Sequence, residues 1–499
     1  MNLRNVHMLW FSKREMTCIL FLRACVFHDR GMQELVLKWQ LVTLVEKKEK
    51  GMEYNFRFPK DLYADVRIEE SESLWLGMEN GELKNDGESA EIGAMVRVFD
   101  GNLWYTATTN SLEEIQGQLD ALAQMATPNP KIADERIVKE FEVHQEERFL
   151  YSGENDLRKV SRAKWKEIMD GYVEKCADPE DPDVSFWFCG VSGRHLIKRF
   201  YSSKGAKIAW DRQQCNLNFF YGFTVNGVTN YGGKGYTTMT VPELLGHEAE
   251  ILEKKAQYLD YAKNAVDITP GDYECVLAPF VTAMFTHESF GHKSEADFML
   301  NDKTLREEWV MGKKVGSEKV SICDMGDLPN HGYVPYDDEG TKAGKIYLMK
   351  DGILTGRLHD ANSASIMGEA KTGNARAQDY HFQPIVRMTN TYMEAGKDNP
   401  EDMIAGVKDG IYVVDVNNGT GNSTFVMNPS LCYRIRDGKI CEPVRVHMIT
   451  GSVFQTLFDI EGVGTDFELF DTYNCGKMGQ GVNVSAGGPS IHVKRLAFN

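Results

Sequence analysis

Residues 62–84 read LYADVRIEESESLWLGMENGELK, and this stretch decides how the fold begins. Apolar and polar residues alternate along it, which is typical of strands that turn one face to a core. The pair Asn80-Gly81 interrupts the alternation and is a strong signal for a tight hairpin turn. Residues 90–109, AEIGAMVRVFDGNLWYTATT, repeat the pattern around Asp100-Gly101. We therefore predict that the main fold opens with antiparallel strands joined by short turns.

Helical segments follow these strands. Residues 111–126 place Ile115, Leu119 and Leu122 on one face of a helix. We expect helices at 111–126, 154–176 and 241–265, and strands at 184–226 with a turn at 203–205. Pro270-Gly271 then breaks the pattern and favours a domain boundary nearby. A helix around 278–299 opens the second half, which becomes strand-rich, with hairpin turns at Asp351-Gly352 and Asp437-Gly438.

The fold class that these segments predict is α+β, because strands and helices are segregated rather than strictly alternating. We expect an N-terminal α+β domain at residues 52–268. A strand-rich C-terminal catalytic domain is expected at residues 269–499.

Bulk composition limits the class of protein. The 499 residues carry a formal net charge of −17, with 42% hydrophobic and 26% charged residues, which is ordinary for a globular chain. The sequence has no basic stripe of useful length, so we expect no direct nucleic-acid partner. Its best candidate for a membrane helix, residues 16–27, is shorter than the roughly 18 residues required, so we expect no membrane partner. Ten cysteines are scattered without Cys-x-x-Cys pairs, which favours reduced thiols and a cytoplasmic location.

Residues 1–51 differ from the rest of the chain in charge. They hold nine Lys or Arg residues against five Asp or Glu residues, whereas the remainder is strongly acidic. Met52 then opens a segment that reads like an ordinary protein start. We predict that residues 1–51 are an extension from upstream of the true start. Mass spectrometry of the native N-terminus tests this, and peptides from residues 1–40 would contradict it.

The motif that carries chemistry lies in residues 284–300, MFTHESFGHKSEADFML. His287, Glu288 and His292 have the spacing H-E-x-x-x-H, one residue longer than the H-E-x-x-H of common zinc peptidases. In a regular helix, residues five apart point about 140° away from each other. Both imidazoles can therefore face one ion only if the helix is distorted. A π-type turn supplies such a distortion, and Gly291 tolerates it at low cost.

The residue types suit a catalytic zinc site. Imidazole is a good zinc ligand, and a catalytic zinc keeps three protein ligands and one position for water. Glu288 is next to a ligand and is our candidate general base for the metal-activated water. Two histidines leave one ligand missing, and spacing alone leaves Glu295, Asp297 or a distant Cys or His open. A chance cluster on a polar helix face is the competing explanation.

The sequence resembles the TldD/PmbA family of metallopeptidases, and in particular its catalytic TldD branch, over roughly residues 55–499. Four stretches carry the resemblance in order: HESFGHKSEAD (287–297), DDEGTKAGKIYLMKDGILTGRLHD (337–360), PIVRMTNTYMEAG (384–396) and NCGKMGQGVNVSAGGPSIHV (474–493). The resemblance implies that Cys475 is the third zinc ligand beside His287 and His292. It also implies a dimer around an internal cavity, often a heterodimer with a PmbA-type (TldE) subunit. Substrates would be peptides or unfolded polypeptides that enter as an extended strand.

Further residues near these motifs also have predicted roles. Glu295 is a candidate partner for a ligating imidazole, and Asp297 lies two residues beyond it. Arg387 and Asn390 are expected either to bind the substrate backbone or to brace the site. By default, Asp337, Asp338 and Glu339 form a solvated surface turn. Residues 417–432 contain no acidic residue, which departs from the family pattern and concerns substrate preference.

These observations predict a zinc-dependent peptidase in which Glu288 is the general base. A non-catalytic regulatory or binding subunit of a TldD/PmbA-type complex is the alternative. A zinc hydrolase of non-peptide amides is a third possibility.

Overall fold

The hairpin predicted from residues 62–84 is present in the structure, a computed structural model that describes residues 54–178, 180–421 and 423–499. Strands β1 (Tyr63–Glu79) and β2 (Glu82–Phe99) are joined through Asn80 and Gly81. The φ angles of these two residues, 47° and 87°, are both positive, as a tight hairpin turn requires. The extension predicted at residues 1–51 lies outside the described residues.

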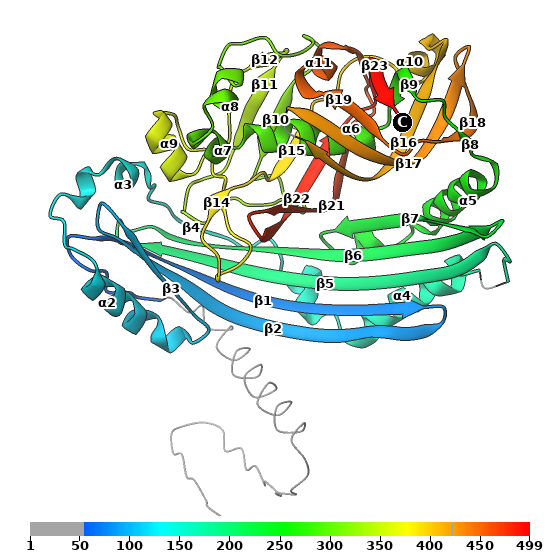
Figure 1. The fold of residues 1–499 in the computed structure, drawn as a ribbon. Helices are drawn as coiled ribbons and strands as arrows, with labels where there is room; N and C mark the ends of the chain where they lie inside the picture. The colour runs from blue at the N-terminus through cyan, green and yellow to red at the C-terminus, as the bar shows by residue number, and fades with distance from the viewer. Residues whose placement is uncertain (1–53, 179, 422) are drawn as a thin grey trace, which may run out of the picture. The chain divides into compact units, whose positions relative to one another are not determined.

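A long, curved sheet, here called the N-terminal sheet, continues from this hairpin (Figure 1). Within the described residues it has seven strands in the order β3-β2-β1-β5-β6-β4, with β7 also paired to β6. All its pairs are antiparallel except β4–β6. The other strands are β3 (Trp104–Thr109), β4 (Gln145–Arg148), β5 (Val184–Ser202), β6 (Lys207–Val225) and β7 (Val228–Thr238).

Helices α2 (Ile115–Met125), α3 (Arg136–Glu140), α4 (Arg162–Cys176) and α5 (Glu248–Asn264) accompany this sheet. Two of them begin later than the sequence predicted. Helix α4 starts at Arg162 because the Ser161 side chain accepts a hydrogen bond from Lys164 N–H and caps it. Helix α5 starts at Glu248 because Gly246, with φ of 92°, ends a separate short turn at Pro242–Leu244.

The C-terminal part of the chain is strand-rich, as predicted. One sheet has the order β12-β11-β10-β15-β22-β21. In a second sheet, strands β16, β9, β23, β19 and β17 pair in a closed ring. The bounds are β8 (Val266–Asp267), β9 (Gly271–Leu277), β10 (Ile322–Met325), β11 (Lys345–Lys350), β12 (Ile353–Leu354), β13 (Ala375–Arg376), β14 (Ile385–Val386), β15 (Asn390–Met393), β16 (Asp409–Gly421), β17 (Thr424–Arg436), β18 (Lys439–Arg445), β19 (Ile449–Ser452), β20 (Ile460–Val463), β21 (Glu468–Lys477), β22 (Gln480–Gly488) and β23 (Ile491–Phe498).

The helix expected around 278–299 is present as a chain of short helical segments with different pitches. They are α6 (Pro279–Phe285), a π-helix η6 (Thr286–Gly291), a 3-10 turn η7 (His292–Ser294) and α7 (Ala296–Leu300). Phe285 and Phe290 are fully buried in the core of the C-terminal sheets, so this chain of segments is held inside the protein. The remaining helices are α8 (Lys303–Glu308), α9 (Ala361–Met367), α10 (Pro400–Gly406) and α11 (Val453–Phe458).

The acidic turn at Asp337, Asp338 and Glu339 is buried, so the expectation of a solvated surface turn was wrong. Lys198 of β5 donates to Asp338 at 2.8 Å, and Arg97 of β2 donates to Glu339 at 3.4 Å. These partners could not be predicted from local sequence, because they lie more than a hundred residues away along the chain. Buried ion pairs therefore join the N-terminal sheet to the strand-rich part.

Segregated strands and helices confirm the predicted α+β class. Among the described residues, no helix has both the length and the apolar character that crossing a membrane requires. The division into domains at residue 268 stays a prediction.

Candidate metal centre

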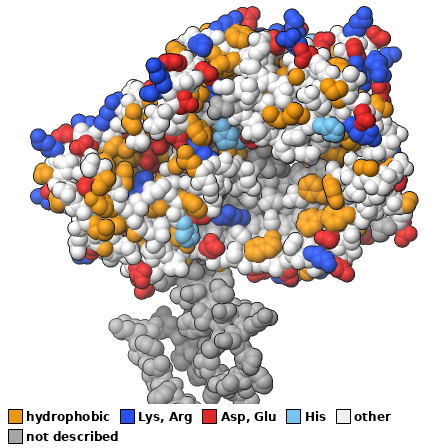
Figure 2. Space-filling view, viewed as in Figure 1, with side chains coloured by type: hydrophobic (Ala, Val, Ile, Leu, Met, Phe, Trp, Pro, Cys, Tyr) orange, Lys and Arg blue, Asp and Glu red, His pale blue; other side chains and the backbone are white. Residues whose placement is uncertain are grey.

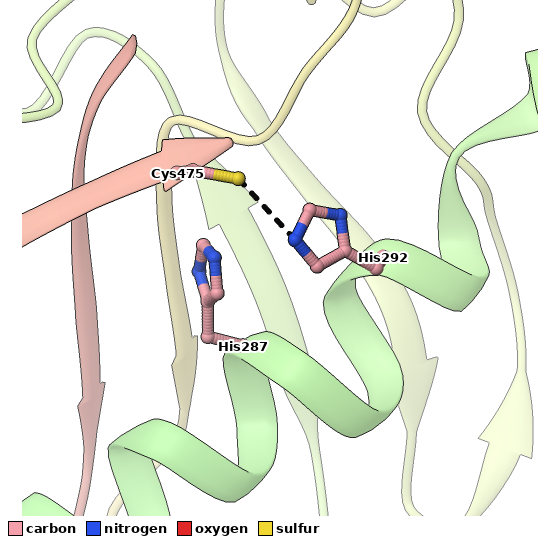
Figure 3. Close-up of side chains that lie close together, drawn as sticks. All are labelled: His287, His292 and Cys475. Carbon is pink, nitrogen blue, oxygen red and sulfur yellow. Dashed lines mark hydrogen bonds between the residues drawn. The ribbon is translucent and has the colours of Figure 1, made fainter. Parts of the chain in front are cut away.

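The π-helix brings His287 and His292 to the same side of the helical segment (Figure 3). Their ring centroids are 5.1 Å apart, with the ring planes at 80°. An added residue in the turn compensates for the five-residue spacing, which would separate the two side chains in a regular helix. The distortion predicted from the sequence is therefore present.

Gly291 has a different role from the one that the sequence suggested. Its φ and ψ of −58° and −56° are ordinary helical values, so the freedom of glycine to adopt unusual angles is not used. A Cβ atom here would lie 2.1 Å from Sδ of Met388, a fully buried side chain. Met388 packs directly against the turn, so a side chain at position 291 would require Met388 or the turn to move.

Cys475 reaches the two histidines from strand β21. Its Sγ lies 3.3 Å from Nε2 of His292, and the donor atoms of Cys475, His287 and His292 all lie within 4.8 Å of one another. Strand β21 is placed there by β22, which pairs in parallel with β15 beside the π-helix. The structure thus brings together all three residues that the sequence and the family resemblance suggested.

The charges in this cluster favour ionised sulfur. Burial disfavours the thiolate, but hydrogen bonds from His287 and His292 lower the pKa of Cys475 from 9.0 to about 5. Burial likewise opposes the charge on His292, but hydrogen bonds to Cys475 and Glu295 raise its pKa to about 10. A thiolate and two imidazoles are donors that zinc and similar transition metals prefer. The residues present therefore fit a metal ion, whose positive charge would take the place of the imidazolium proton.

Glu288 lies next to this cluster and is half-buried. Burial raises its pKa above the ordinary value, against the opposing influence of His287 and His292. Strand β16 passes close to it, because a Cβ on Gly419 would lie 3.4 Å from Cγ of Glu288. A carboxylate with a raised pKa beside a donor cluster is suited to accept and return a proton.

Glu295 contacts the donor cluster directly, and Asp297 contacts it through Lys477. Glu295 is fully buried, and its Oε2 lies 3.0 Å from Nδ1 of His292. Lys477, which the sequence analysis did not single out, donates to Asp297 at 2.7 Å and lies 3.2 Å from Glu295. Its position two residues after Cys475, in the Cys-Gly-Lys motif, was the signal that could have found it.

Arg387 and Asn390 are fully buried and hydrogen-bond to the chain itself. Arg387 donates to the carbonyl oxygens of Cys475 and Gln480 and so holds both strands of the β21–β22 hairpin. Asn390 donates to Met325 O at 2.7 Å. Of the two roles open for these residues, the contacts favour bracing over substrate binding.

Comparison with known proteins gives the family. Residues 270–499 match the model of the PmbA/TldA metallopeptidase C-terminal domain, and residues 64–127 match domain 1 of the same family. A metalloprotease of Synechocystis is 29% identical over 441 residues, which cover 87% of this chain and 93% of the relative. A protein of Saccharolobus solfataricus named zinc metalloprotease TldD homolog is 33% identical over 313 residues, covering 60% of this chain and 68% of the relative.

A solved structure extends the likeness to the fold. TldE from Thermococcus kodakarensis superposes with a TM-score of 0.68 at 17% identity, over 92% of this chain and 99% of that protein. At this identity the likeness concerns the fold alone. Together with the family models and the relatives, it shows that this chain belongs to the PmbA/TldA (TldD/PmbA) family of metallopeptidases.

Proposed function

We propose that this chain is a zinc-dependent peptidase that uses His287, His292 and Cys475 as metal ligands and Glu288 as the general base. One observation carries the proposal: donor atoms from two histidines and a distant cysteine converge within 4.8 Å, next to a half-buried carboxylate. The names of the metalloprotease relatives support it.

The chain's own residues supply most of the chemistry. When bound, zinc lowers the pKa of water and polarises the carbonyl of the scissile bond. Glu288 takes the proton from the attacking water and delivers it to the leaving amine. Glu295 accepts a hydrogen bond from Nδ1 of His292 and so leaves Nε2 free to face the metal.

An extended peptide has a suitable place beside this centre. Strand β21, which carries Cys475, is the last strand in its sheet among the described residues. Its free backbone edge is able to pair with an added strand, which binds the main chain and makes few demands on side chains. We propose peptides and unfolded polypeptides as substrates, and a dimer, with a TldE-type subunit as one candidate partner.

The test compares the wild type with Glu288→Gln, which keeps the side-chain shape but removes the base. We expect both proteins to bind zinc, measured by elemental analysis. We also expect the variant to cleave casein about a hundredfold to ten-thousandfold more slowly. Glu307→Gln is the matched control, because the Glu307 side chain is 67% exposed on α8.

Two outcomes would contradict this proposal. Undiminished cleavage by Glu288→Gln would exclude Glu288 as the base. A wild type that binds zinc but cleaves nothing, even with a TldE-type subunit added, would favour the regulatory subunit instead.

A further inference from the structure

The face of the N-terminal sheet that meets the C-terminal part carries many buried charges, and most of them are paired. Arg97 forms two hydrogen bonds to Asp65 at 2.9 and 2.8 Å. Farther along, Arg67 lies 3.0 Å from Glu69. Each of these cations therefore has a carboxylate partner on its own sheet.

Arg194 of β5 and Arg212 of β6 depart from this pattern. In the register of the two strands, Arg194 lies opposite Gln214 and Arg212 lies opposite Leu196, so the arginines are diagonal neighbours on one face. Within the described residues, neither guanidinium has a hydrogen bond or ion pair to a carboxylate, and Nε of Arg194 is buried without a partner. Both side chains are only half-buried, so a ligand is able to reach them.

Contacts of the flanking residues show where this face points. On β6, Trp210 packs edge-on against Tyr333, and Gln214 accepts a hydrogen bond from the side-chain amide of Asn483. Arg212 lies between these two positions on the same face, because side chains two residues apart on a strand share a face. Its guanidinium is therefore directed toward the C-terminal part.

A third guanidinium, that of Arg376, approaches from the other side. It is 3% exposed and donates to the carbonyl oxygens of Met388 and Asn483, with no carboxylate partner among the described residues. Burial, together with the charges of Arg376 and Arg194, lowers the pKa of Arg212 to about 9. The carboxylates that oppose this shift, Glu69 and Asp338, already pair with Arg67 and Lys198. The three arginines therefore carry more positive charge than the nearby carboxylates neutralise.

Asn483 connects Arg376 to the hairpin that carries Cys475. It pairs in register with Asn474, the residue before Cys475, and its carbonyl accepts the hydrogen bond from Arg376. The molecular surface is hollowed between the N-terminal sheet and the strands above it (Figure 2). A peptide bound along β21 would run beside Asn474, whose paired residue Asn483 contacts both Arg376 and Gln214, the residue opposite Arg194.

We propose that Arg194 and Arg212, backed by Arg376, form an anion site that receives a carboxylate of the peptide substrate. The inference rests on the proposed peptidase function and specifies its substrate class. Guanidinium groups pair with carboxylates through two parallel hydrogen bonds, and such charge-assisted bonds are strong where water is partly excluded. The carboxylate is either an acidic side chain near the scissile bond or the free C-terminus of the peptide.

Binding tests the site independently of cleavage. The probe is a short, fluorescently labelled, alanine-rich peptide in three forms: C-terminal amide, C-terminal acid, and amide with one alanine replaced by glutamate. Fluorescence anisotropy with full-length, zinc-loaded Glu288→Gln protein gives the affinities. We expect a carboxylate-bearing form to bind roughly tenfold to a hundredfold more tightly than the neutral amide. If the C-terminal acid binds most tightly, the carboxylate is the C-terminus of the peptide. If the glutamate form binds most tightly, the carboxylate is an acidic side chain.

Substitutions on the same background locate the site. Arg212→Ala should reduce the preference to less than about threefold while leaving the affinity for the neutral amide unchanged, and Arg212→Lys should keep part of it. The control is Arg199→Gln on the neighbouring strand β5, because Arg199 is paired with Glu70. If Arg212→Ala does not fold, the proposal is tested with Arg194→Gln. The comparison of the three peptides on Glu288→Gln alone tests it as well.

Equal affinity for acid, glutamate and amide forms would overturn the anion site. Equal weakening of all three forms by Arg212→Ala would also overturn it, because that pattern indicates a structural role. A carboxylate preference in a protein whose wild type cleaves no peptide would retain the site and reject the peptidase function.

Discussion

Nζ of Lys477 lies 2.7 and 2.8 Å from the two carboxylate oxygens of Asp297 and so ties strand β21 to helix α7. The same ammonium lies 3.2 Å from Glu295, whose other contact is with His292. One lysine thus holds both the strand that carries Cys475 and the carboxylate that orients a histidine. All three charged groups are largely buried, so each depends on the others for stabilisation.

Lys477→Met should strongly destabilise the fold and weaken metal binding. It leaves Glu295 and Asp297 buried without their cation, a loss that costs about 3–5 kcal/mol in comparable pairs. Urea denaturation and metal analysis measure the two effects. Lys494→Met is the control, because the Lys494 side chain is 68% exposed. An unchanged denaturation midpoint with full metal content would show that the buried pair is dispensable.

Cys475→Ala should lower the zinc content sharply, because it removes the sulfur donor and leaves two imidazoles. Elemental analysis after dialysis gives the zinc-to-protein ratio. Cys441→Ala is the matched control, because Cys441 lies on β18 outside the donor cluster and is only partly buried. Stoichiometric zinc in Cys475→Ala would mean that the third ligand is another residue.

Gly291→Ala should destabilise the protein by about 1–3 kcal/mol, because the new methyl group collides with the buried Met388 side chain. Metal affinity should fall with it, since the π-helix must shift to relieve the collision. Gly171→Ala in α4 is the control: a Cβ there meets nothing within 4 Å, and alanine should stabilise the helix by roughly 0.5–1 kcal/mol. The midpoints of thermal unfolding of the two variants are compared. Equal midpoints would contradict the predicted collision with Met388.

Glu339 should make stability depend on pH. Burial raises its pKa from 4.5 to about 7 in the folded chain. The charge of Arg97 opposes this shift, and the charge of Asp360 adds to it. The folded state therefore holds a proton that the unfolded state releases first. This stabilisation is fully present below about pH 4.5 and is lost as the pH rises through about 7.

Glu339→Gln should remove that dependence. Between about pH 4.5 and pH 8, the free energy of unfolding of the wild type should fall by roughly 1–3 kcal/mol relative to the variant. Urea denaturation across this range gives the difference, with Glu307→Gln as an exposed control. A difference that stays constant with pH would show that Glu339 is ionised throughout.

Local sequence was sufficient for much of the secondary structure. Alternation and the Asn80-Gly81 turn predicted the β1–β2 hairpin, because strand periodicity and positive φ angles depend on neighbouring residues alone. Helix starts were less accurate. The beginning of α4 depends on a cap at Ser161, and several nearby residues resemble a helix start equally well in sequence.

By itself, the sequence determined that a helix with histidines five residues apart must be distorted if both are to face one point, because helix geometry allows nothing else. It did not determine what meets them. Cys475, which meets His292, lies 183 residues farther along the chain. Met388 packs against Gly291, and Lys477 pairs with Asp297 next to the cluster. Arg194 and Arg212 acquire meaning only from the register of β5 with β6 and from the part of the chain facing them. Strand pairing decided these contacts, because it brings together residues whose separation along the chain carries no local signal.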